Sequence, residues 1–148
     1  MKRLLLVIVA VAVAAIALPL GAQAAGGPSA EGTGQSSTYG SVHVNAHPVP
    51  FSTQHPFGAE GHFFIKKQGV QGDVLCIRTF GPFAAVGGVD TATQSRWLII
   101  VQDGGSPGHG NDQHSVRPAT NQESETCVPN NTGPPLVPIQ QGNYVVSD

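Results

Sequence analysis

From residue 39 onward, apolar and polar residues alternate with a period of two in several short segments. This alternation is typical of β-strands that bury one face. No window places apolar residues at helical spacing without an interrupting Gly or Pro, so we expect no substantial helix. The predicted strands are 39–46, 61–67, 73–80, 83–91, 96–102, 114–117 and 143–146.

The types of apolar residue in the chain indicate the same fold class. After residue 24 the chain has 13 Val but only three Leu, and β-branched side chains suit a pleated surface. The segments 73–80 and 96–102 are almost entirely apolar, as central strands would be. With 19 Gly and 12 Pro available for turns, the sequence predicts an all-β domain. We expect a β-sandwich or an open Greek-key barrel of about seven strands.

The N-terminal residues have the pattern of an export signal. Lys2 and Arg3 precede an apolar run from Leu4 to Leu20, and Ala22-Gln23-Ala24 offers the small-x-small pattern of a cleavage site. We predict a signal peptide over residues 1–24. The run is short for a spanning helix, so we expect a secreted, extracellular protein without a membrane span after cleavage.

The residues that follow divide into a leader and a domain. Residues 25–37 contain no bulky apolar side chain, which predicts a flexible leader, and residues 38–148 are the predicted β-domain. After residue 24 there are five basic and nine acidic residues, a net charge of −4. That balance disfavours nucleic acid and anionic membranes as partners.

Two cysteines, Cys76 and Cys127, are the whole complement. In an exported protein they are expected to form a disulfide. Cys127 lies in a segment rich in Pro and polar residues, 119–141, for which we expect an irregular loop. The disulfide would then tie this loop to the strand that carries Cys76.

Three stretches resemble a group of small secreted bacterial β-rich proteins that have no assigned activity. They are GHFFIKKQGVQGDVLCI at 61–77, AAVGGVDTATQSRWLIIVQDGGSPGHGND at 84–112, and QQGNYVVSD at 140–148. The loop Asp103 to Gly108 is the most specific part of the resemblance, although its Gly104 stands where such proteins usually carry Asn. The resemblance implies an extracellular β-sandwich-like module, sometimes appended to larger exported proteins, and supplies no catalytic residue.

The same loop contains a G-x-S-x-G pattern centred on Ser106. A hydrolase nucleophile elbow needs the backbone N–H of the next residue, which here is Pro107 and has none. We therefore expect a hairpin or Ω-type loop and no catalytic residue. Ser106, His109 and Trp97 are retained as candidate binding residues, and Trp97 is alternatively a core side chain.

Metal binding is the main chemical alternative. Asp103, Asn111 and Asp112 offer oxygen ligands for calcium, although both Asp residues can equally cap turns. The six histidines at 43, 47, 55, 62, 109 and 114 invite a zinc or copper site. His43 and His47 share one strand face but lie ~13 Å apart, so we expect solvated surface histidines.

These features predict a secreted, non-catalytic module with a binding or structural role. Its partner would be an extracellular ligand, polymer or protein, and no cofactor is expected. The loops 103–112 and 119–141 are the expected contact regions. The alternative is a small extracellular hydrolase or a calcium- or zinc-dependent protein.

Overall fold

The computed structural model describes residues 27–105, 111–130 and 134–148. The predicted signal peptide, Ser106 and His109 lie outside these ranges. No helix among the described residues is long and apolar enough to cross a membrane.

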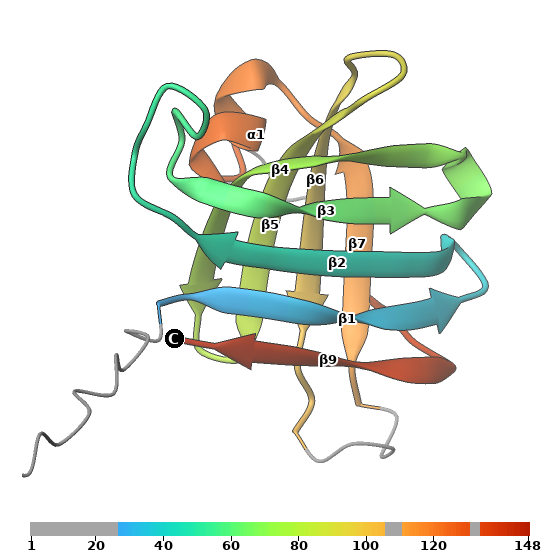
Figure 1. The fold of residues 1–148 in the computed structure, drawn as a ribbon. Helices are drawn as coiled ribbons and strands as arrows, with labels where there is room; N and C mark the ends of the chain where they lie inside the picture. Colours follow the sequence, from blue (N-terminus) through green and yellow to red (C-terminus); the bar gives the residue numbers. More distant parts are fainter. Residues whose placement is uncertain (1–26, 106–110, 131–133) are drawn as a thin grey trace, which may run out of the picture.

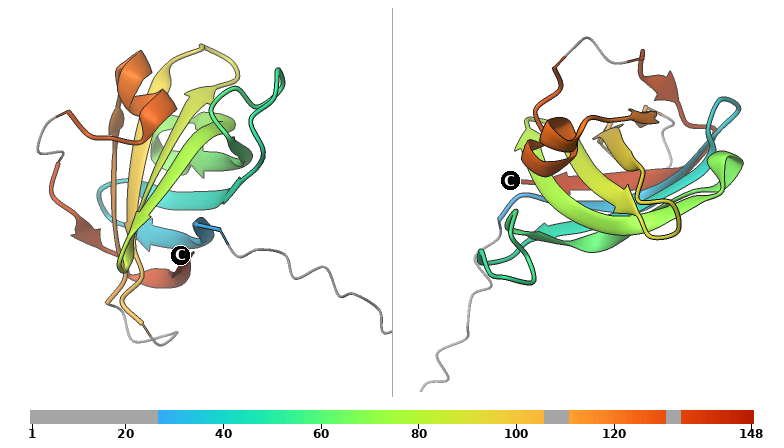
Figure 2. Two further views of the ribbon diagram at one scale, coloured as in Figure 1. Left: turned by 90° about the vertical axis from the view of Figure 1, so that its left-hand side faces the viewer. Right: turned by 90° about the horizontal axis from the view of Figure 1, so that it is seen from above.

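Nine strands form one antiparallel sheet that curls into a half-barrel (Figures 1 and 2). The strands are β1 (Ser29–Ser36), β2 (Gly40–Pro48), β3 (Ala59–Ile65), β4 (Val70–Phe80), β5 (Phe83–Asp90), β6 (Arg96–Gln102), β7 (Gln113–Pro118), β8 (Val137–Pro138) and β9 (Gln141–Ser147). A 3₁₀ turn, η1 (Lys66–Gln68), joins β3 to β4, and a short helix, α1 (Asn121–Thr126), follows β7.

The all-β class is confirmed, but the predicted number of strands is wrong. The sheet has nine strands in the order β8-β7-β6-β5-β4-β3-β2-β1-β9. Strands β1 to β8 each pair with their neighbours in the sequence, so the connectivity is a meander and not a Greek key. Each predicted segment corresponds to an observed strand, and β1 and β8 are the two additions.

β1 overturns part of the predicted leader, because residues 29–36 pair with both β2 and β9. Its inward positions include Ala30, Gly34 and Ser36, all buried. A Cβ at Gly34 would lie 2.7 Å from ring and hydroxyl atoms of Tyr144. The strand is therefore built from small residues because the Tyr144 ring occupies the space above it.

The concave inner face of the sheet holds the main core. Its large, fully buried side chains come from strands at both ends of the meander, among them Val42, Phe63, Val86, Ile99 and Tyr144. Close packing of these side chains is the main source of stability for such a sheet.

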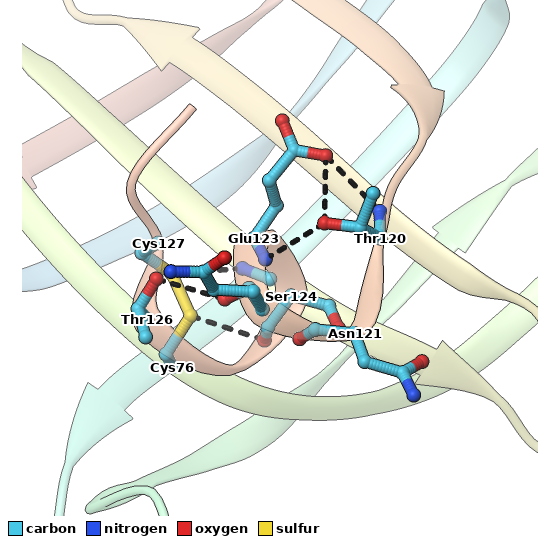
Figure 3. The surroundings of a disulfide bond; sticks show 9 residues. Cys76, Thr120, Asn121, Glu123, Ser124, Thr126 and Cys127 are labelled. Carbon is cyan, nitrogen blue, oxygen red and sulfur yellow. Dashed lines mark hydrogen bonds between the residues drawn. A yellow bond between two sulfur atoms is a disulfide. The ribbon is translucent and has the colours of Figure 1, made fainter. Parts of the chain in front are cut away.

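α1 covers a second, smaller core on the outer face of β4, β5 and β6. A bulge makes this possible: Val74 pairs with Gly88 while Cys76 pairs with Gly87, so Leu75 is the extra residue. The bulge turns Cys76 away from the main core that Val74 joins. Cys76 thereby reaches Cys127 at the end of α1 (Figure 3).

The predicted disulfide between Cys76 and Cys127 is confirmed. The prediction that 119–141 is irregular is wrong, because the segment contains α1 and β8. A capping box starts α1: Glu123 N–H donates to Thr120 Oγ1, and Thr120 N–H donates to Glu123 Oε2 (Figure 3). The Glu123 carboxylate also pairs with Arg117, which with backbone donors holds its pKa well below its usual range.

Candidate functional site

α1 packs against β4, β5 and β6, and it does not cover the outer face of β2 and β3 (Figure 2). Alternation brings the side chains of His43 and His47 to this surface from β2, and those of Glu60 and His62 from β3. We call these four residues together with His55, from the preceding loop, the histidine face.

His43 and His62 meet across the β2–β3 pair. Their Nε2 atoms are 3.2 Å apart and their ring centroids 5.1 Å apart. Nδ1 of His43 lies 2.9 Å from Oγ1 of Thr33 on β1. Three strands therefore fix the position of one imidazole and bring a second against it.

A carboxylate lies between two further imidazoles. His47 Nε2 is 3.0 Å from Glu60 Oε1, and His55 Nε2 is 3.4 Å from Glu60 Oε2. The Glu60 and His47 side chains are both 42% exposed, so this is a solvent-screened cluster with a modest effect on stability. Its His55–Glu60 contact links the 49–58 loop to β3, and the hydrogen bond from Val49 N–H to Gly58 O joins the two ends of that loop.

A pocket of about 290 Å³ opens beside this cluster. The 49–58 loop contributes Gln54, His55, Pro56 and Phe57, and the strands contribute Ala59, Glu60, Gly61, Asp73, Val74, Leu75 and Val89. The lining therefore combines two carboxylates, an imidazole and an amide with an aromatic ring and aliphatic side chains. Its volume is near the lower end for small-molecule sites.

The pocket and the histidine pair lie on one acidic surface. In the strand register Asn45 is opposite His62, with Glu31 beyond it on β1 and Asp73 beyond His62 on β4. The Oδ1 atom of Asn45 is shielded from solvent and has no hydrogen-bond partner among the described residues. Carboxylates thus flank Asn45 and His62 on both sides of their cross-strand row, which favours a cation near His62.

Burial lowers the pKa of His43 below its usual value, and the neighbouring His62 lowers it further. His43 is consequently neutral at neutral pH, with a nitrogen lone pair available as an acceptor or ligand.

The three calcium candidates, Asp103, Asn111 and Asp112, lie near one another in the structure. The oxygens of both carboxylates accept hydrogen bonds from backbone N–H groups. Gly105 N–H and Val146 N–H donate to the two oxygens of Asp103. Gly104 N–H and Tyr144 N–H donate to those of Asp112, while Asn111 is exposed. Both carboxylates therefore cap backbone groups, the alternative weighed from the sequence.

Trp97 and His114 differ in how deeply they are buried. Trp97 is half-buried against the main core, and its indole Nε1 has no hydrogen-bond partner within the described chain. His114 is fully buried, so the prediction of a solvated histidine is wrong there. The other four histidines of the described residues, His43, His47, His55 and His62, lie together on one face of the sheet.

Across residues 27–105, 111–130 and 134–148, no group of three or more His, Cys, Asp or Glu side chains could enclose a metal ion. The sequence therefore did not indicate two features: the pairing of His43 with His62, and the separate pocket beside Glu60. The pocket needs the 49–58 loop to fold back over β3 and β4, which no spacing in the sequence indicates.

Comparison with known proteins adds no family: no family model, no curated protein and no solved structure matches this chain. The resemblance to secreted bacterial β-rich proteins stays a prediction.

Proposed function

We propose that the protein is an exported, non-catalytic binding module that holds sugar units of an extracellular polysaccharide in the pocket beside Glu60. The observation that carries the proposal is the composition of that pocket. Glu60 and Asp73 offer acceptors for hydroxyl groups, and Phe57 and Pro56 offer apolar surface for the carbon faces of a sugar ring.

The lining has no Lys or Arg, so it favours neutral or cationic ligands over anionic ones. Its floor is formed by β3, β4 and β5, which makes it a rigid platform with one loop wall. The disulfide supports export, because such bonds persist in oxidising compartments.

The test is sedimentation of the purified protein with insoluble peptidoglycan, chitin and cellulose. We expect at least one polymer to carry the protein into the pellet, and the double variant Glu60→Gln/Asp73→Asn and the variant Phe57→Ala to stay in solution. Gln122→Ala, an exposed position on α1, is the matched control and should bind normally. No binding to any polymer, or equal binding by all variants, would contradict the proposal.

One observation favours the alternative hydrolase function: His47, Glu60 and His55 form a converged set of two imidazoles and a carboxylate. Such groups can act as general acids and bases when a substrate lies within hydrogen-bond reach. Release of soluble reducing sugars from the same polymers, abolished in Glu60→Gln, would establish that function in place of the non-catalytic one.

A further inference from the structure

His43 and His62 are spaced as two ligands of one metal ion would be. A tetrahedral ion with metal–nitrogen bonds of about 2.0–2.1 Å holds its nitrogen ligands about 3.3 Å apart. The observed Nε2–Nε2 distance is 3.2 Å. The two nitrogens therefore need almost no movement to share an ion.

The surroundings of the pair have the features of a ligand set that is held in place. In the tautomer in which Nδ1–H of His43 donates to Thr33 Oγ1, the Nε2 atom carries the lone pair that a metal requires. Such an outer hydrogen bond fixes both the tautomer and the ring orientation. Asn45, directly opposite His62, adds an oxygen that has no partner among the described side chains.

Charge and access favour a cation here. Glu31 and Asp73 stand on either side in the same cross-strand row, and His62 is exposed to solvent. Neutral imidazoles select late first-row divalent ions over calcium or magnesium, which prefer oxygen ligands.

We propose that His43 and His62 form a surface site for one divalent transition-metal ion, copper(II) or zinc(II), with water completing the coordination. The two imidazoles lie outside the lining of the pocket beside Glu60, and Asp73 is the residue that borders both sites. The metal site needs neither a polysaccharide nor the 49–58 loop.

The test is titration of the purified protein, without a histidine tag, with copper(II) and zinc(II) salts in a calorimeter. We expect one ion per chain, copper(II) held more tightly than zinc(II). His43→Gln and His62→Gln should each abolish this binding. Thr33→Val, which removes only the outer hydrogen bond, should weaken it about tenfold.

His47→Gln is the matched control, because it removes an imidazole from the same face of the same strand and should leave the affinity unchanged. Nitrogen hyperfine splitting should be present in the copper(II) electron paramagnetic resonance spectrum of the native protein and lost in His62→Gln. Thermal unfolding in chelator shows that each variant is folded. Unchanged binding in His43→Gln, an equal loss in His47→Gln, or no bound ion would overturn the proposal, whatever the polymer assay gives.

Discussion

The imidazole of His114 and the phenol of Tyr144 meet inside the curled sheet, with Nδ1 and Oη 2.7 Å apart. Tyr144 O–H donates to the carbonyl of Val42, so Nδ1–H of His114 must donate to Tyr144. Nε2 of His114 then accepts from the hydroxyl of Ser36, which accepts from Tyr39 N–H. All the hydrogen bonds in this buried network can form together only when His114 is neutral.

Acid should therefore weaken the fold through His114. Burial lowers its pKa to about 4, whereas the unfolded chain titrates near 6.5, so between these values the unfolded state binds more protons. The contribution is fully present above pH 6.5 and is lost as the pH falls. Between pH 7 and pH 5 we expect a loss of about 2 kcal/mol.

Denaturant unfolding at the two pH values measures this loss. His114→Gln cannot be protonated, so its stability should change much less between pH 7 and pH 5, although it begins lower. The window lies above the ordinary pKa of carboxylates, which excludes Glu123 as the cause. An equal pH dependence in both proteins would rule out His114 as the sensor.

Removing the disulfide should destabilise the domain strongly. Cys76 and Cys127 are 51 residues apart in sequence, and closing a loop of that size contributes about 4 kcal/mol in the chain-entropy model. We expect the double variant Cys76→Ser/Cys127→Ser to unfold at a much lower denaturant concentration. Adding reductant should shift the midpoint of the native protein in the same direction and leave the double variant unaffected.

Gly87 should tolerate no side chain. A Cβ there would lie 2.3 Å from Ser124 O and 2.7 Å from Cys76 Sγ. Gly87→Ala must displace α1 or the disulfide, and we expect a loss of about 2 kcal/mol or more. Gly81→Asn is the comparison, since nothing lies within 4 Å of a Cβ there and Asn tolerates its positive φ. Similar stability for both variants would show that α1 does not press on β5.

Removing the capping box of α1 should destabilise the domain less than Gly87→Ala does. Thr120→Ala removes the acceptor for Glu123 N–H and should cost about 1 kcal/mol. Thr120→Ser keeps the hydroxyl and should lose little. If both substitutions have the same effect on the denaturation midpoint, the hydroxyl is not what starts the helix.

Export should be visible in the mass of the mature protein. We expect the chain recovered from outside the cell to begin at Ala25, as determined by intact-mass measurement. The double variant Ala22→Leu/Ala24→Leu should block cleavage, because the peptidase accepts small side chains at these positions. A protein retained inside the cell with Met1 intact would contradict the predicted signal peptide.

The sequence predicts the strands that bury bulky residues and misses those that do not. β2 and β6 have strong apolar patterns, whereas the inward residues of β1 are all small. Gly34, for example, has no side chain because the Tyr144 ring occupies the space above it. The pattern also does not predict α1, although Thr120 and Glu123 have the spacing of a capping box. That spacing is present in the sequence, but the prolines and polar residues around it favour a loop.

The histidine face is harder to predict than the fold. Alternation places His43 on the same side as His47, but it does not say which β3 residue lies beside His43. That neighbour follows from the register, in which Val44 pairs with Phe63 and Asn45 with His62. A shift of one residue would send His62 to the opposite face of the sheet. Register depends on the packing of the whole inner face.

The pairing of β1 with β9 constrains the order in which the domain assembles. Gly32 lies opposite Tyr144, so this edge of the sheet forms only after the most distant parts of the domain meet. Hairpins such as β5–β6 can close early at small entropic cost, whereas the β1–β9 ladder has the largest loop to close. The slowest folding step should therefore be the docking of β9, and until then β1 exposes an unsatisfied edge to other chains.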